Sequence, residues 1–169
     1  MSDHLIKRTE SAYGHPLLVC HLLSRLAAQH ADQEIVYAGT LRFSYAEFRE
    51  RVLRLAEGFQ SIGVGPGDTV AVMDWDSHRY LECFFAVPMV GAVLHTINIR
   101  LAPEQILYTV NHAKDTVILV HDDFAPLLKN FEGQTPTIQR VVRLTDSSAS
   151  PVPEGLRFDI EYEIGRAHV

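Results

Sequence analysis

The sequence has few cysteines and no cluster of basic residues. It has two cysteines, Cys20 and Cys83, and neither belongs to a Cys-x-x-Cys pair. A disulfide framework is therefore not expected, and the cytoplasm is the expected location. Basic clusters are also missing, because the 15 lysines and arginines are scattered among 21 acids, for a net charge of −6. Nucleic-acid binding needs such clusters, so we expect no nucleic-acid partner.

Long hydrophobic runs are absent as well. The longest apolar stretch, residues 83–94, contains Pro88 and Gly91 and is shorter than the roughly 18–20 residues of a membrane span. No transmembrane segment is therefore expected, and the N-terminal residues lack the apolar core of a signal peptide. What remains is an ordinary globular composition, with 47% hydrophobic residues over a length of 169 that suits about one domain.

Helical and strand patterns alternate along most of the chain. Residues 1–16 are predicted to form an irregular N-terminal arm, and residues 145–155 a polar loop. Between them we predict helices that begin at residues 17 and 103 and helices at 44–63, 77–90 and 124–131. We predict a hairpin of strands at 34–37 and 42–44, and further strands at 69–73, 92–97, 116–120 and 138–144. This alternation predicts an α/β fold, with right-handed βαβ crossovers in a partial doubly wound sheet.

Two local patterns support these predictions. Ser44 and Glu47 have the spacing of a capping box at the start of a helix. Helical spacing of apolar residues also predicts three apolar stripes, of which the first and third are expected to be buried. They are Tyr45, Phe48, Val52, Leu55 and Phe59 in the first; Tyr80, Phe84 and Val87 in the second; Ile106, Leu107 and Val110 in the third.

The glycines of Gly63-x-Gly65-x-Gly67-Asp68 suggest a phosphate-binding loop at first sight. Such a loop follows a strand and begins a helix, so that helix N–H groups point at phosphate. Here the glycines follow a helix and precede a strand. We therefore interpret them as a helix-to-strand turn with positive φ angles.

Polar residues at the ends of two predicted strands are the candidate site residues. His95 and Asn98 lie where open α/β sheets bind ligands, so they either border a cleft or hold the local loop into Arg100 by hydrogen bonds. Asp74, Asp76 and Ser77 follow the preceding strand. We favour helix capping for these three over a Mg²⁺ site.

Other reactive residue types point to structural roles. Asp122 and Asp123 are interpreted as a solvated loop, and Cys83 as a core residue, because it has no basic neighbour in sequence to activate a thiolate. The nine histidines show no spacing typical of metal ligands, and no Ser/His/Asp nucleophile motif is present. The residues themselves therefore assign no catalytic, cofactor-binding or metal-binding position.

The helix at 43–63 and the turn Gly65-Pro66-Gly67-Asp68 resemble the N-terminal region of the AMP-forming acyl-CoA synthetases, a branch of the adenylate-forming superfamily. The stretches 95–105 (HTINIRLAPEQ) and 111–115 (NHAKD) are more specific. They resemble the medium- and long-chain fatty-acid–CoA ligases and the related methylmercaptopropionate-CoA ligases. By this resemblance, residues 17–162 are part of the large N-terminal domain of such an acid–thiol ligase.

The resemblance implies a two-step reaction. A fatty acid reacts with Mg·ATP to form an acyl-adenylate, and the CoA thiol then displaces AMP; a homodimer is expected for the full-length enzyme. The Thr/Ser/Gly-rich phosphate loop of that family does not occur in this sequence. No catalytic residue can therefore be carried over, and we expect the chain alone to be inactive and to bind ATP, CoA and Mg²⁺ weakly.

Three alternatives remain open at this point. The chain could instead belong to another acid–thiol ligase of the superfamily, be a self-standing α/β binding module, or be a flavodoxin-type nucleotide-binding domain. Residues 163–169 (EIGRAHV) match the translation of a common sequencing-library adapter. We interpret this heptapeptide as non-native and exclude it from the fold.

Overall fold

A parallel sheet forms the centre of the molecule. The computed structural model describes residues 9–11, 13–14, 18–147, 150–155 and 158–162. The sheet has the spatial order β4-β3-β5-β6-β7, and every neighbouring pair is parallel. Its strands are β3 (Thr69–Met73), β4 (Val93–Thr96), β5 (Val117–His121), β6 (Arg140–Leu144) and β7 (Ile160–Glu161). Counted along the chain this is the 2-1-3-4-5 order of doubly wound α/β proteins, so the predicted fold class is confirmed.

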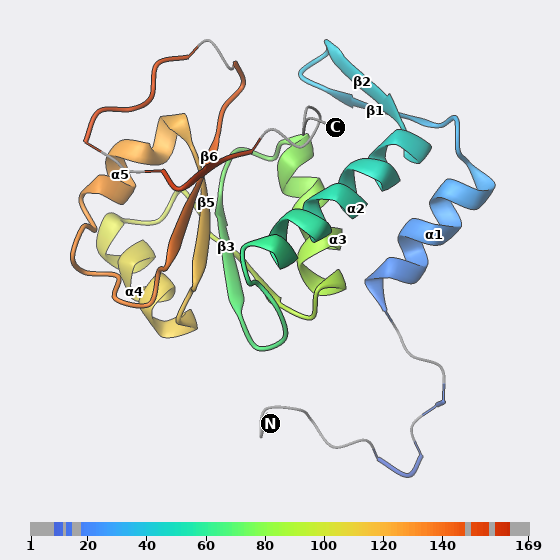
Figure 1. Cartoon of the computed structure of the whole chain (residues 1–169), viewed down its shortest axis with the longest axis horizontal. Coiled ribbons are helices and arrows are strands. Elements are labelled where there is room, and N and C mark those ends of the chain that lie inside the picture. The colour runs from blue at the N-terminus through green and yellow to red at the C-terminus, as the bar shows by residue number, and fades with distance from the viewer. Residues whose placement is uncertain (1–8, 12, 15–17, 148–149, 156–157, 163–169) are drawn as a thin grey trace.

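Helices cover both faces of this sheet (Figure 1). One face carries α2 (Tyr45–Ser61) and α3 (His78–Met89), and the other carries α4 (Pro103–Ala113) and α5 (Ala125–Lys129), preceded by the short 3₁₀ helix η1 (Asp122–Phe124). Outside the first layer, α1 (Val19–Gln29) packs against α2 and α3. An antiparallel hairpin, β1 (Glu34–Tyr37) and β2 (Leu41–Ser44), leads directly into α2.

The two faces of the sheet build two separate hydrophobic cores. In β3, Val70 and Val72 pack with α2 and α3, whereas Ala71 and Met73 pack with α4 and α5. All five residues of β5 are buried. Such continuous burial is typical of a parallel strand that helices cover on both sides.

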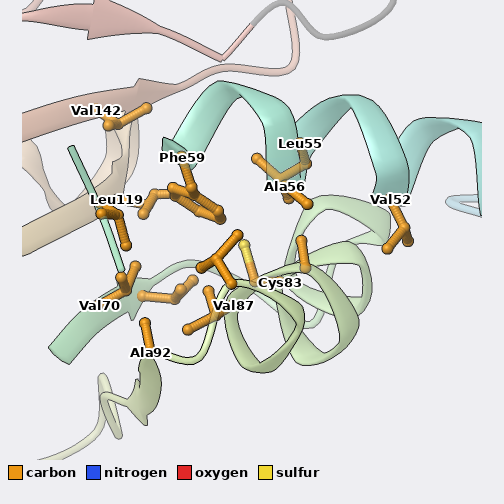
Figure 2. Packing of buried hydrophobic residues seen from close by; sticks show 14 of the residues in the cluster. Val52, Leu55, Ala56, Phe59, Val70, Cys83, Val87, Ala92, Leu119 and Val142 are labelled. Carbon is orange, nitrogen blue, oxygen red and sulfur yellow. The ribbon is translucent and has the colours of Figure 1, made fainter. Parts of the chain in front are cut away.

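The larger core surrounds Cys83 (Figure 2). Phe59 of α2 and Cys83 and Val87 of α3 lie together in this core, next to Val70 and Leu119 of the sheet. Cys83 is fully buried, and this burial raises the pKa of its thiol well above the usual range. A thiol in this state is a core side chain rather than a nucleophile, which confirms the prediction.

The local predictions around α2 are confirmed. Ser44 Oγ accepts the Glu47 N–H at 3.2 Å, and the Glu47 carboxylate accepts the Ser44 N–H at 2.7 Å. After α2, Gly63 and Gly67 adopt φ angles of +87° and +97°, which favour glycine. The Asp68 carboxylate closes the turn by accepting an N–H from the loop, so the glycines form a helix-to-strand turn.

The predicted apolar side of α3 is only partly buried, because Val87 is fully buried whereas Phe84 is 44% exposed. The inward face of this helix also holds the charged residues Arg79 and Glu82, and each has an ion-pair partner. In α1, Leu23 is buried and Leu22 is exposed. The stripes of α2 and α4 agree with the prediction in their buried members Phe48, Val52, Leu55, Phe59, Ile106 and Val110.

Some predictions concern segments that are described only in part. Of the predicted arm at 1–16, residues 9–11 and 13–14 are described, and they contain no helix or strand. The heptapeptide 163–169 lies outside the described residues.

Candidate functional site

A cavity of about 450 Å³ opens at the carboxyl ends of β3 and β4. Its apolar wall is formed by Trp75, Tyr80, Ile97 and Ile99, and its polar side by Asp74, Asp76, Thr96, Asn98 and Arg100. Ligand pockets typically combine apolar walls with a few polar groups in this way. The position also agrees with the general rule that open parallel sheets bind ligands at their carboxyl edge.

Ser77 caps the N-terminus of α3, and Asp74 contacts Ser77. Ser77 Oγ accepts the Tyr80 N–H at 3.3 Å, and the Ser77 hydroxyl donates to the Asp74 carboxylate. Asp74 also accepts the Trp75 N–H at 2.8 Å, and its burial raises the pKa of the carboxyl. The predicted cap is therefore present at Ser77, supported by Asp74, whereas Asp76 remains exposed at the rim of the cavity.

These residues do not fit a Mg²⁺ ion. Within the described part of the chain, no group of three or more histidine, cysteine or acidic side chains could hold a metal ion. Asp74 in addition already accepts hydrogen bonds from Trp75 and Ser77. We therefore derive no metal-dependent step from this part of the molecule.

The candidate pair His95 and Asn98 is separated in the structure. Asn98 Oδ1 accepts the Arg100 N–H at 3.0 Å, which is the local loop contact considered above, and Asn98 also lines the cavity. His95 instead lies 2.7 Å from the carboxylate of Asp115, through its Nδ1 atom. Asp115 is fully buried between α4 and β5, and this burial raises its pKa. His95 is thus directed at the α4 side of the sheet rather than at the cavity.

The neighbouring part of the carboxyl edge, beyond β5 and β6, is filled by ion pairs. Arg79 donates to Asp146 at 2.7 Å and to the Thr145 carbonyl at 3.0 Å. His121 lies 3.5 Å from Asp146 and 3.4 Å from Asp123. Arg79 and His121 are both only 5% exposed, so this network occupies the space next to the strands.

Arg143 forms a second part of the same network. It donates two hydrogen bonds to Asp122, at 2.7 and 2.9 Å, and one to Glu161 at 2.9 Å. It also donates to two backbone carbonyls of the loop at 150–151. The interpretation of Asp122 and Asp123 as a solvated loop is therefore wrong for Asp122, which binds Arg143. It holds for Asp123, which is exposed although its carboxylate accepts the Trp75 indole N–H at 2.7 Å.

These contacts argue against the alternative of a flavodoxin-type nucleotide-binding domain. In a sheet of this order, a flavodoxin-type ligand would lie between the carboxyl ends of β3 and β5. Here Trp75, which follows β3, packs on Phe124, which follows β5, with ring centroids 4.9 Å apart. Arg79 and His121 are buried nearby, since His121 also contacts the Phe124 ring and both residues contact Asp146. Side chains of the protein itself therefore meet between the ends of β3 and β5, and the open cavity lies on the β4 side.

Comparison with known proteins places this fold in a family. Residues 23–163 match the protein family described as "AMP-binding enzyme". A long-chain-fatty-acid–CoA ligase of Thermus thermophilus is 41% identical over 137 residues, which are 79% of this chain and 25% of that protein. This chain belongs to the AMP-binding enzyme family.

Two further relatives of this chain are CoA ligases by name. A 3-methylmercaptopropionyl-CoA ligase of Ruegeria pomeroyi is 33% identical and a medium-chain-fatty-acid–CoA ligase of Ectopseudomonas oleovorans 35%, each over 87% of this chain. The chain spans about a quarter of the length of these relatives, 25–28%.

Solved structures show the same fold. A fatty acyl CoA synthetase of Mycobacterium tuberculosis superposes with a TM-score of 0.69 at 22% identity, over 73% of this chain and 26% of that one. An anthranilate CoA ligase with bound anthranoyl-AMP also superposes with a TM-score of 0.69, over 73% of this chain and 24% of that one. The sheet described above thus corresponds to the N-terminal part of adenylate-forming enzymes. Among the helices described, none is long and apolar enough to cross a membrane.

Proposed function

We propose that this chain is part of a fatty-acid–CoA ligase that activates a fatty acid with ATP and transfers the acyl group to CoA. The observation that supports this most directly is the 41% identity to a long-chain-fatty-acid–CoA ligase. The sequence 95–105, of which residues 96–100 line the open cavity, carries the same resemblance. The proposal extends to residues 17–162 as part of the large domain, to a cytoplasmic location and to a homodimeric full-length enzyme.

The chemistry explains why the chain alone is proposed to be inactive. An anionic carboxylate must approach the polyanionic phosphates of ATP, so cationic groups and Mg²⁺ are needed around the reacting phosphorus. The described residues supply no metal-binding group, and the family's phosphate loop does not occur in the sequence. We therefore expect no acid-dependent pyrophosphate release from this chain by itself.

3-Methylmercaptopropionate is a second candidate for the acid substrate. The 33% identity to a 3-methylmercaptopropionyl-CoA ligase covers 87% of the chain, so the short sulfur-containing acid competes with fatty acids as the proposed substrate. The residues of the cavity favour neither acid, because its wall is apolar and its rim carries both charges.

The test uses the full-length protein encoded at the source locus. Thioester formation with ATP and CoA would be measured for octanoate, palmitate and 3-methylmercaptopropionate. We expect a thioester from at least one fatty acid. A thioester from 3-methylmercaptopropionate alone would favour the second candidate, and no thioester from any of the three acids would contradict the proposed function. The 169-residue chain is the control that should release no pyrophosphate.

A further inference from the structure

The contact between His95 and the buried Asp115 joins the two ends of one segment of the chain. His95 belongs to β4, and Asp115 follows α4. Nδ1 of His95 lies 2.7 Å from Oδ2 of Asp115, although the two residues are 20 positions apart in the sequence. The segment that this contact closes contains α4 and the residues 96–100, which line the carboxyl-edge cavity.

Asp115 is the fixed end of this segment. Its N–H donates to the Val110 carbonyl of α4 at 3.3 Å. The next N–H, that of Thr116, donates to the Thr69 carbonyl of β3 at 2.9 Å. Backbone hydrogen bonds to α4 and to β3 therefore hold the Asp115 carboxylate, which is fully buried, at one place in the fold.

Strand β4 is the less supported end. It lies at the edge of the described sheet, where β3 is its one neighbouring strand. Just beyond β4 the Ile97 N–H donates to the Val72 carbonyl of β3 at 3.1 Å, whereas the Arg100 N–H donates to Asn98 within the loop. The cavity wall at 96–100 therefore depends on how firmly β4 is held, and the side-chain contact with the fixed end adds to that hold.

Asp115 in turn depends on His95. Among the described residues, Oδ2 of Asp115 has His95 as its partner, and Oδ1 is buried with no hydrogen-bond partner. Burial raises the pKa of this carboxyl, and the hydrogen bond with His95 opposes that shift. A buried carboxyl group is costly to leave unpaired, so the folded chain favours the arrangement in which His95 stays in place.

We propose that His95 is a positioning residue for the carboxyl-edge cavity, and its role in substrate binding rests on the proposed function. His95 does not line the cavity itself. Bound to Asp115, it holds β4 so that the residues 96–100 form the cavity wall. A ligand binds only the fraction of molecules in which that wall is formed, so a looser β4 lowers the apparent affinity by that fraction.

Two substitutions separate the hydrogen bond of His95 from its bulk. His95→Asn keeps an N–H donor near the position of Nδ1, and His95→Leu has a side chain of similar size without a donor. The matched control is His112→Leu, which removes an exposed histidine of α4 that stacks on Tyr108. The first readout is amide hydrogen exchange of the 169-residue chain, followed residue by residue by NMR.

We expect His95→Leu to speed exchange about tenfold at the Ile97 and Arg100 amides, the scale of a lost hydrogen bond to a charged group. Exchange at Leu119, in the central strand β5, should not change. His95→Asn and His112→Leu should leave all three rates as they are. Equal acceleration at all three amides would make His95 a residue of general stability and overturn the proposal. Unchanged exchange in His95→Leu, or an effect of His95→Asn as large as that of His95→Leu, would also overturn it.

Asp115→Asn tests the same contact from its other end, and decides the matter if His95→Leu does not fold. An amide replaces the buried carboxyl without leaving an unpaired charge. It should speed exchange at the Ile97 and Arg100 amides, by less than His95→Leu does, because a neutral acceptor forms the weaker hydrogen bond. No change at either amide would overturn the proposal.

The second readout is the kinetics of thioester formation by the full-length protein. His95→Leu should raise the KM of the acid or of ATP about tenfold with kcat unchanged, because binding is lost equally in the ground state and the transition state. Unchanged KM values beside faster exchange would overturn the role in substrate binding and leave the ligase intact. If the unchanged protein forms no thioester, the proposed function fails, and the exchange rates alone decide whether His95 positions the cavity wall.

Discussion

The two halves of the sheet's carboxyl edge differ in what fills them. Beyond β5 and β6, the buried side chains of Arg79, His121 and Arg143 join acids and loop carbonyls into one network. Beyond β3 and β4, residues of the same polar character surround an open cavity. Trp75 lies between them, since its ring lines the cavity and its indole N–H donates to Asp123 on the filled side.

This difference separates structural charge from charge that is available to a ligand. Buried charged groups are tolerated only when they are paired, so the filled half must keep every partner in place. Exposed groups at the rim of the cavity carry no such requirement. Substitutions in the filled half should therefore reduce stability, and those in the open half should affect binding.

The largest effect is expected for Arg143→Met. Its side chain is 2% exposed, and removing the guanidinium leaves Asp122, Glu161 and two loop carbonyls without their donor. Because both acids are partly exposed to water, we expect a loss near the lower end of the range for a broken buried pair, about 3 kcal/mol in the free energy of unfolding. Urea denaturation followed by circular dichroism would measure it.

The control for this prediction lies on the same strand. Arg140 is exposed, and its guanidinium donates only to the neighbouring Gln139 carbonyl. Arg140→Ala should change stability by less than about 0.5 kcal/mol. Similar losses in the two variants would show that charge on β6, rather than the buried network, stabilises the fold.

A smaller effect, dependent on pH, is expected at His78 beside the filled half. Burial, with Arg79 and Arg51 nearby, lowers the pKa of His78 from 6.5 to about 4. Because the folded-state pKa is depressed, the unfolded chain binds the proton first as pH falls. Stability is therefore lost between about pH 6.5 and pH 4, by about 2 kcal/mol once partial exposure is allowed for.

The comparison variant His78→Gln isolates this contribution from the other histidines. Urea denaturation of both proteins at about pH 7 and about pH 4.5 should show a smaller pH-dependent loss in the variant. Equal losses would assign the acid sensitivity to other groups. A titration of the His78 ring by NMR gives its pKa independently.

Most of the fold could be predicted because its signals are local. The Ser44–Glu47 capping box and the positive φ at Gly63 depend on residues within one or two turns, and both occur as expected. Strand β3 was predicted at its observed bounds, because a short β-branched run between turn signals has few alternatives. The spatial order of the strands, by contrast, depends on contacts between distant segments.

The candidate site was predicted less well, and for a related reason. Arg143 in β6 and Arg79 in α3 pair with residues that lie far away in the sequence, Asp122 and Asp146. The sequence does indicate that Arg143 is paired, since an arginine inside the apolar run Arg140–Leu144 needs a buried partner. Which acid would supply that partner could not be read from spacing. The contact of His95 with Asp115 could not be predicted either, because the two residues are 20 positions apart in the sequence.

The boundary between the two halves can be tested at Asp123. Asp123→Ala removes the acceptor of the Trp75 indole N–H, whose bond length is 2.7 Å, and keeps the single tryptophan of the chain as a fluorescent probe. We expect a loss of about 1 kcal/mol in the free energy of unfolding, the usual net contribution of one hydrogen bond. Trp75 emission should shift to the red and become more accessible to acrylamide.

Asp76→Ala is the matched change on the open side of Trp75. Asp76 is exposed at the cavity rim and makes no hydrogen bond with a described residue, so neither stability nor quenching should change. A shift in emission from this variant as large as that from Asp123→Ala would contradict the boundary, because Trp75 would then depend equally on both sides.

The smallest effect on stability is expected for Asn98→Ala in the open half. Its side chain is exposed and accepts one N–H, from Arg100, so the loss should stay below about 0.5 kcal/mol in the free energy of unfolding. In the full-length protein the same change should alter the KM of the acid or of ATP, because Asn98 lines the cavity. A destabilisation as large as that of Asp123→Ala, with unchanged KM values, would make Asn98 a structural residue. The open half of the edge would then be as structural as the filled half, and the ligand site would have to lie elsewhere.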